Sequence, residues 1–199
     1  YIKNEKRMGY GYCYYNLFKK YAVNYKYMAW VSGHDVYENN WLEECFNTII
    51  VDSSISVVYP INDRIDEDSK FIREEKRKFS ALEEDKYLRL KSLLHRGTNF
   101  GQIIYGLFDV SKVIKAGITR NLNLADTVLI WEIAIFGKIV QIEKKLWHFR
   151  FDYFKGDKDP SISKLMSKRQ KKNRFAKPGI YLNIPWPILN SLTIFFNYL

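Results

Sequence analysis

Cysteine is scarce in this chain, which holds only Cys13 and Cys45 among its 199 residues. The two lie far apart and outside any Cys-x-x-Cys spacing, which excludes a disulfide framework and gives no support to a zinc site. We therefore expect two reduced thiols, buried as small apolar side chains, in a cytoplasmic protein.

Long apolar runs are lacking as well. No stretch combines a charged start with the apolar run of a signal peptide. Before residue 178 no largely apolar run is long enough to cross a membrane, and beyond it Pro178, Pro185 and Pro187 interrupt the pattern. The sequence therefore argues against a simple membrane-spanning helix.

Acidic residues are outnumbered, 22 against 32 basic ones, so the formal net charge is +10. Such a charge attracts nucleic acid, anionic lipid headgroups and diphosphates without choosing among them. Acidic residues are absent from 160–199, where a basic cluster precedes an aromatic, apolar stretch. Residues 164–199 therefore fit three roles: peripheral contact at the inner face of the cell membrane, a solvated loop with a packed helix, or polyanion binding.

What is present is an ordinary globular composition, 47% hydrophobic, with many aromatic residues. Length and hydrophobic content predict one domain with a sizeable core. Fifteen Tyr, thirteen Phe and five Trp exceed what a core requires, so we expect some of them to line a cleft or a membrane-facing surface.

Apolar periodicity predicts a helix, a strand, a helix and a strand early in the chain, at 16–24, 27–31, 41–50 and 55–59. A strand, a helix and a strand with short connections form a βαβ unit, which implies a parallel sheet. The second strand is expected to end at Pro60.

Charge dominates residues 62–91, which we interpret as a solvated turn followed by an exposed helical or mobile segment. Apolar pattern returns later in the chain. It predicts helices at 111–116 and 124–136, closed by Gly117 and Gly137, and short strands at 138–142 and 146–151.

An acidic residue, Asp35, follows the strand 27–31 after a short turn. Open α/β sheets bind ligands at the carboxyl ends of strands, and a carboxylate there can hold a divalent cation that offsets a diphosphate. The adjacent His34 could ligate Mn²⁺ or hydrogen-bond a phosphate. By itself, Asp35 fits a turn or cap residue as well.

The residues around Asp35 favour the functional interpretation. Residues 30–43 read Trp-Val-Ser-Gly-His-Asp-Val-Tyr-Glu-Asn-Asn-Trp-Leu-Glu, and residues 57–60 read Val-Val-Tyr-Pro. This order resembles family 2 glycosyltransferases, in which a Tyr-x-x-Trp strand runs into an acidic cluster, a Leu-Glu helix start and a strand ending in Tyr-Pro. The resemblance implies that Asp35 binds Mn²⁺ or Mg²⁺, with His34 standing where the family usually has another Asp.

A second segment, residues 124–137, resembles the family pattern Asp-x-x-Leu-x-x-Glu-Leu-Ala-x-x-Gly. Its Asp126 lies at the expected start of an apolar helix, where a capping role is equally reasonable. The resemblance implies that Asp126 is the catalytic base. Inverting transfer needs a carboxylate that takes the proton of the acceptor hydroxyl as its oxygen attacks the anomeric carbon.

Residues 103–108, Ile-Ile-Tyr-Gly-Leu-Phe, resemble a strand that lines the acceptor side of the cleft in this family. The resemblance places Gly106 and Trp30 on that side. A glycine there would let substrate approach the backbone, although a glycine within a strand fits a bulge equally well.

Residues 145–152 resemble the family's closing Leu-Tyr-x-x-Arg-x-His element, in which Arg and His approach the diphosphate. Arg150 matches the Arg and could bind phosphate oxygens in a bidentate fashion. Asp152 stands in place of the His, and both residues are candidates for the donor phosphate site.

The fold that the resemblance implies is α/β, of the Rossmann-like GT-A type, with a mixed, mostly parallel sheet flanked by helices. It assigns residues 1–160 to a partial catalytic domain and 161–199 to a basic linker with an amphipathic, aromatic end. The first nucleotide-binding strands would precede Tyr1, so we expect the isolated chain to bind donor poorly and to transfer slowly.

The expected function is transfer of a sugar from a nucleotide-diphosphate-sugar to a hydroxyl of a glycan or lipid-linked acceptor, in polysaccharide or glycan synthesis. The alternative is a non-enzymatic module that binds nucleic acid or acidic polymer through its charge and aromatic residues. That alternative leaves the arrangement of Asp35 and Asp126 unexplained, so we favour the enzyme over nucleic-acid binding.

Overall fold

The computed structural model describes residues 10–75, 78–95, 102–118 and 125–150. The candidate phosphate residue Asp152 and the predicted C-terminal segment 161–199 lie outside the described residues.

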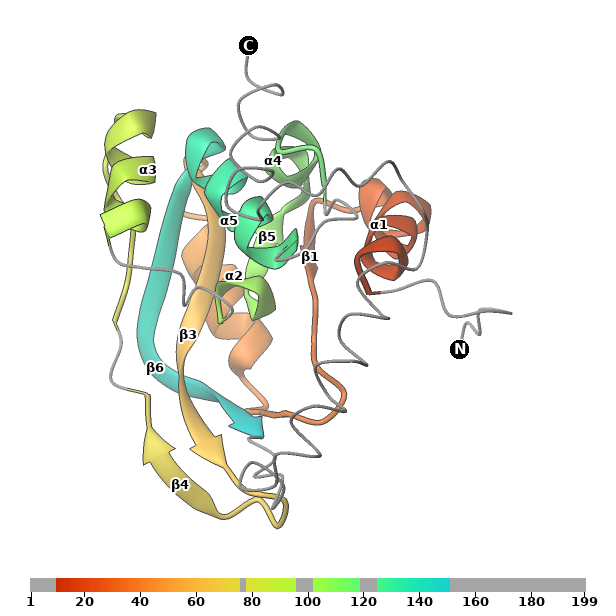
Figure 1. The fold of residues 1–199 in the computed structure, drawn as a ribbon, viewed down its shortest axis with the longest axis vertical. Coiled ribbons are helices and arrows are strands. Elements are labelled where there is room, and N and C mark those ends of the chain that lie inside the picture. The colour runs from red at the N-terminus through yellow and green to blue at the C-terminus, as the bar shows by residue number, and fades with distance from the viewer. Residues whose placement is uncertain (1–9, 76–77, 96–101, 119–124, 151–199) are drawn as a thin grey trace, which may run out of the picture.

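The described residues form a mixed six-stranded sheet. Its order is β1–β5–β3–β6–β2, with β4 pairing β3 beside this path (Figure 1). The strands are β1 (Tyr27–Ala29), β2 (Val36–Tyr37), β3 (Ile55–Ile65), β4 (Phe71–Glu74), β5 (Leu107–Asp109) and β6 (Lys138–Arg150). The long pair β3 and β6 is parallel, and the other four pairings are antiparallel.

Helices cover both faces of the sheet. They are α1 (Tyr10–Lys20), η1 (Ala22–Asn24), α2 (Trp41–Ile49), α3 (Lys86–His95), η2 (Ile103–Tyr105), α4 (Val110–Lys115) and α5 (Ala125–Phe136). Alternate residues of β3 point to opposite faces, so Val57 packs with α1, α4 and α5, whereas Val58 packs with α2 (Figure 1). The chain is therefore a three-layer α/β structure.

The α/β class is confirmed, but the prediction of a mostly parallel sheet is wrong. Strands β1 and β3 run in the same direction, as a βαβ unit requires. They are not neighbours, however, because each pairs antiparallel with β5 between them. The intervening strand comes from residues 107–109, far along the chain, and local patterning carries no information about such an insertion.

Strand β3 does not end at Pro60 but continues to Ile65. On one edge, β3 pairs with β5 as far as Val58 and with β4 from Asp63 onwards. Pro60 lies between these two pairings, where β6 is the one neighbouring strand, and the register with β6 shifts just after Pro60. A missing N–H is tolerated at such a position. The predicted solvated stretch from residue 62 is therefore wrong for the end of β3, where Asn62 and Asp63 are buried.

Two glycines close helices for different reasons. Gly117 follows α4 with φ 83°, the left-handed conformation expected of a helix-ending glycine. Gly137 does not have a positive φ; instead, an added Cβ would lie 2.3 Å from the backbone oxygen of Ser54. Close approach of two backbones requires the second glycine. It lies where β6 begins, and β6 is one continuous strand rather than the two that periodicity predicts.

Candidate functional site

The predicted metal ligand Asp35 lies in the loop between β1 and β2, and its side chain is completely buried. The indole Nε1 of Trp147 donates to its Oδ2 at 3.0 Å, and the backbone N–H of Arg150 donates to its Oδ1 at 3.0 Å. Both carboxylate oxygens therefore accept hydrogen bonds from the C-terminal end of β6.

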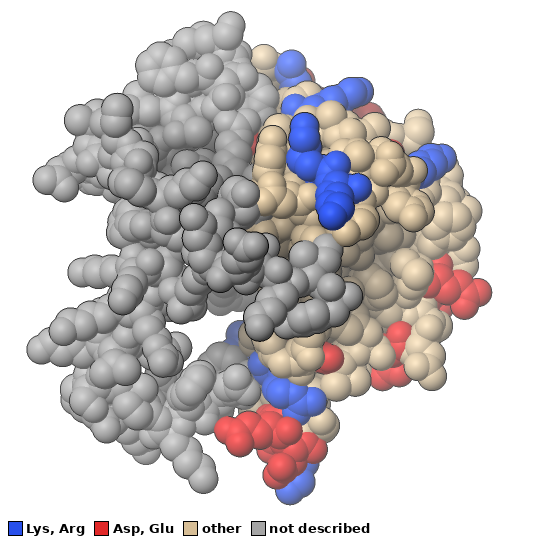
Figure 2. Space-filling view, turned by 90° about the vertical axis from the view of Figure 1, so that its right-hand side faces the viewer, with Lys and Arg blue, Asp and Glu red and all other residues tan. Residues whose placement is uncertain are grey.

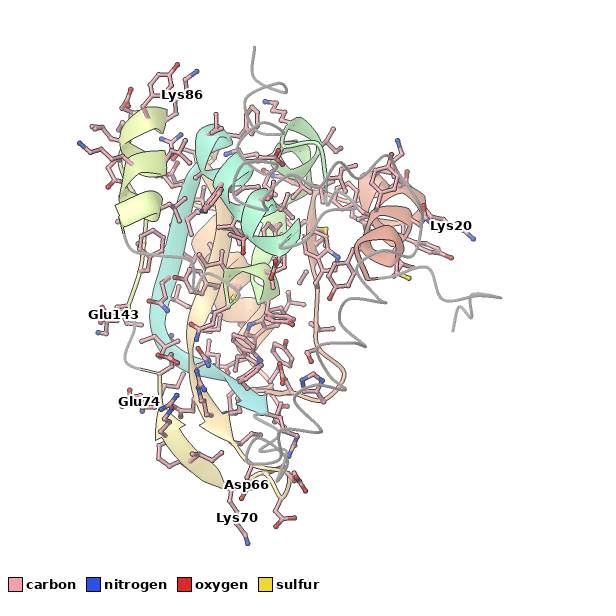
Figure 3. The ribbon with its side chains drawn as sticks, viewed as in Figure 1. Lys20, Asp66, Lys70, Glu74, Lys86 and Glu143 are labelled. Carbon is pink, nitrogen blue, oxygen red and sulfur yellow. The ribbon has the colours of Figure 1, made fainter. Side chains whose placement is uncertain are left out.

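The predicted phosphate ligand Arg150 is also engaged within the protein. Its guanidinium donates to the backbone oxygens of His34 (2.8 Å), Asp66 (2.6 Å) and Glu67 (2.7 Å), and to Ser69 Oγ (2.8 Å). Asp66 lies at the tip of the β3–β4 hairpin (Figure 3). Four of the five N–H groups of a guanidinium are used in this way, so Arg150 holds two loops together.

His34, by contrast, has a side chain that is 59% exposed. Its Nε2 lies 3.4 Å from Oδ1 of Asp35, and its Nδ1 lies 3.0 Å from Ser32 Oγ. His148 on β6 lies 2.8 Å from Glu38 Oε1 through its Nε2. Of the predicted donor-binding residues that the structure describes, His34 is exposed, whereas Asp35 and Arg150, as whole residues, are partly buried.

These residues do not fit a preformed divalent-cation site. Such a site needs several oxygen or nitrogen ligands facing one point, and no group of three or more His, Cys, Asp or Glu side chains able to hold an ion occurs among the described residues. Asp35 in addition directs both oxygens at N–H donors. The Mn²⁺ or Mg²⁺ that the resemblance implies stays a prediction.

Asp126, the predicted base, lies in the first turn of α5 and is half-buried. Its Oδ1 accepts the backbone N–H of Thr127 at 2.8 Å. Within the described part of the chain, its Oδ2 has no hydrogen-bond partner. One oxygen is thus fixed at the helix start, while the other is not bonded to any residue that the structure describes.

Tyr105 in η2 connects the two carboxylates electrostatically. Its pKa is raised to about 12, mainly by burial and to a smaller extent by Tyr14, Asp35 and Asp126. Burial likewise raises the pKa of Tyr14, with a smaller contribution from Asp126. Since charges act over a limited distance in a half-buried site, Asp35 and Asp126 both lie within electrostatic reach of the Tyr105 hydroxyl.

Tyr37 on β2 belongs to the same group. Burial raises its pKa to about 12; the backbone N–H of Ser32 lowers the pKa, whereas Asp35 raises it. The ring of Trp147 lies between the two tyrosines, 6.2 Å from the Tyr37 ring and 5.0 Å from the Tyr105 ring, measured between centroids. Sequence analysis missed these phenols as site residues, and the excess of tyrosine was the signal that could have directed attention to them.

The two predicted acceptor-side residues, Trp30 and Gly106, pack against other parts of the protein. Trp30 is 8% exposed and packs against Tyr14, Phe18 and Phe108. At Gly106, an added Cβ would lie 2.6 Å from the backbone oxygen of Val58. Gly106 therefore lets strand β3 lie close to the backbone of this segment, so its effect on a ligand would be indirect.

An open groove of about 730 Å³ lies on the other face of the sheet, beside α2. Its lining is Tyr25, Lys26, Tyr27, Asn39, Leu42, Glu43, Phe46 and Leu107. None of the predicted site residues contributes to it, so it is separate from the region around Asp35 and Asp126.

On the face drawn in Figure 2, Lys and Arg side chains gather towards the top, whereas the largest group of Asp and Glu side chains is at the lower end. The charge on the described part of this face is therefore unevenly distributed. Among the described residues, no helix has both the length and the apolar character needed to cross a membrane.

No protein-family model matches this chain, and no curated protein matches it. Its function must therefore be inferred from its residues and their arrangement.

Proposed function

We propose that this chain carries a glycosyltransferase site, which moves a sugar from a nucleotide-diphosphate donor to a hydroxyl acceptor. The observation that carries the proposal is that the charges of Asp35 and Asp126 both raise the pKa of one phenol, that of Tyr105. For Asp35 the contacts agree, because the Trp147 indole that donates to it has its ring 5.0 Å from the Tyr105 ring. The two carboxylates belong to the segments whose sequences resemble family 2 glycosyltransferases. Their electrostatic action on a common group supports one site of the GT-A type rather than two unrelated acidic positions.

Asp126 is the proposed base. With Oδ1 bonded to the N–H of Thr127, its Oδ2 would accept the proton of the acceptor hydroxyl. The deprotonating oxygen forms a bond to the anomeric carbon, the bond from that carbon to the diphosphate breaks, and the nucleoside diphosphate leaves with the electron pair. Attack from the side opposite the leaving group inverts the anomeric configuration.

Tyr105 is the proposed hydrogen-bond donor beside this base. A pKa of about 12 keeps its hydroxyl protonated at neutral pH. A neutral phenol next to carboxylates can orient a sugar hydroxyl by donating to it, without competing with Asp126 for the proton. The tyrosines thus supply orientation while the carboxylate accepts the proton.

The test is release of nucleoside diphosphate from a panel of UDP-, GDP- and dTDP-sugars, with glycan and lipid-linked acceptors. Because slow transfer is expected, protein and donor concentrations are raised until the wild-type rate can be measured over a range of about 100-fold. Asp126→Asn keeps an oxygen for the Thr127 N–H but removes the base, so we expect release to fall at least about 100-fold. Asp68→Asn is the matched control, because Asp68 is exposed and, among the described residues, its side chain pairs only with the exposed Lys70. Equal activity of both variants would refute the role of Asp126.

The alternative, a basic module for nucleic acid or acidic polymer, makes a different prediction. Its affinity for a polyanion would fall steeply with salt concentration and would be unchanged in Asp126→Asn. Such a result, with no nucleotide release from any donor, would favour the binding module over the enzyme.

A further inference from the structure

Six hydrogen bonds tie the C-terminal end of β6 to the loop before β2 and to the β3–β4 turn. Asp35, Trp147 and Arg150 make all six, and we call these three residues the β6 latch. Asp35 accepts two of the bonds, and the guanidinium of Arg150 donates the other four. The latch therefore uses the side chains that the sequence had assigned to a cation and a diphosphate.

The geometry around Asp35 opposes cation binding. A cation ligand must present an oxygen lone pair to an ion about 2.0 to 2.6 Å away, in a shell completed by other oxygens. Each Asp35 oxygen instead faces an N–H group at 3.0 Å, and the side chain has no exposed surface. Each oxygen keeps a second lone pair, but the side chain has no exposed surface, so an ion could reach it only if the Trp147 indole or the Arg150 backbone moved away. Such a movement would leave a buried donor without a partner.

We infer that the loop of residues 32–37 holds no divalent cation, and that Asp35 and Arg150 are positioning residues that hold His34 at the surface. Applied to sugar transfer, which is the proposed function, this means that the donor diphosphate is bound without a cation ligated by this loop. His34, 59% exposed and next to the latch, is then the side chain of the loop able to hydrogen-bond a phosphate.

The indole N–H of Trp147 is a direct reporter for this inference, since it lies 3.0 Å from Asp35 Oδ2. The experiment titrates MnCl₂ into the ¹⁵N-labelled wild-type chain and follows the indole N–H signals, with Trp147→Phe to assign the reporter. Mn²⁺ at Asp35 would broaden the Trp147 signal selectively and at substoichiometric concentrations. We expect the Trp147 signal to keep its intensity relative to that of Trp41, which lies in α2.

Selective loss of the Trp147 signal, restored by EDTA, would overturn the inference. His34→Ala serves as a second check that does not disturb the buried latch, because the side chain removed is largely exposed. A cation held jointly by His34 and Asp35 would bind more weakly to this variant, whereas we expect the same weak, nonspecific Mn²⁺ isotherm for both chains.

The activity assay separates failure of this inference from failure of the proposed function. We expect nucleotide release to be unchanged by EDTA and reduced at least about tenfold in His34→Ala through a higher KM for the donor. Release that requires Mn²⁺ together with broadening of Trp147 would overturn the inference and leave sugar transfer standing. If no donor releases nucleotide and the Trp147 signal is not broadened, sugar transfer and the role of His34 in donor binding are both overturned. The inference that the loop of residues 32–37 holds no divalent cation is then still supported.

Discussion

Asp35 and Asp126 are both carboxylates near Tyr105, yet their surroundings differ. Asp35 is fully buried and has an N–H donor on each oxygen, supplied by β6. Asp126 is half-buried and has one oxygen bonded to Thr127 while the other is free of partners among the described residues. A buried carboxylate with satisfied oxygens stabilises a fold, whereas a partly exposed one with a spare oxygen can accept a proton.

A match to a sequence motif therefore identifies the position of a carboxylate, whereas its hydrogen bonds determine whether it can bind a ligand or accept a proton. Both residues were assigned a role from the proposed resemblance to one family pattern. In this chain one is the acceptor of a structural latch and the other is the candidate base. Variants of the two residues and of their neighbours can test whether Asp35 is structural and Asp126 is chemical.

The largest effect on stability is expected from removing the Asp35 carboxylate. Asp35→Ala would leave the Trp147 indole and the Arg150 N–H buried without an acceptor, each costing about 1–3 kcal/mol. We expect the free energy of unfolding to fall by about 3 kcal/mol, measured by urea denaturation. Asp126→Ala should lower the free energy of unfolding by less than about 1 kcal/mol. An equal loss of stability in both variants would contradict a structural role confined to Asp35.

A smaller loss is expected at Gly106, which brings η2 and Tyr105 against β3. The Cβ of Gly106→Ala would lie 2.6 Å from the Val58 backbone oxygen, so the segment must shift, at a cost of about 2 kcal/mol. Gly33→Ala is the matched control in the Asp35 loop, because no atom lies within 4 Å of the added Cβ. Thermal unfolding compares the two, and equal melting temperatures would show that this contact is not needed.

The smallest effect on stability near neutral pH is expected from the phenols of Tyr37 and Tyr105. Burial raises the pKa of Tyr37 and Tyr105 to about 12, from about 10 in an unfolded chain, so folding favours their neutral forms. Their stabilising contribution is complete below about pH 10 and is lost as the pH rises through about 12. The double variant Tyr37→Phe, Tyr105→Phe should lose stability less steeply in this range.

Ultraviolet titration of tyrosine ionisation provides the accompanying measurement. The wild-type chain should show a late group of phenols that is diminished in the double variant. Ionisation of all tyrosines together near pH 10 would contradict the burial of this group.

Parts of the fold with a local cause were predictable from sequence. The expected burial of Cys45 is confirmed, since it has no exposed surface, and Gly117 marked the end of α4. Periodicity is sufficient in these cases because the helix itself brings the apolar residues to one face. The expectation of burial is wrong for Cys13, which is only partly buried.

Features that depend on distant partners were not predictable. The insertion of β5 between β1 and β3 reversed the expected parallel pairing, and pairing on its flanks extended β3 through Pro60. The same limitation applies to the site. Asp35 and Trp147 are 112 positions apart in the chain, so no local pattern could reveal that the carboxylate is already engaged.

The most direct test is one rate measurement on two variants, Asp35→Asn and Asp126→Asn, below the melting temperature of both. Loss of the base should lower nucleotide release by at least about 100-fold in Asp126→Asn. Asp35→Asn, which disturbs positioning but not proton transfer, should fall by less than about tenfold. The reverse order, with Asp35→Asn inactive and Asp126→Asn active, would contradict the division between a structural and a chemical carboxylate.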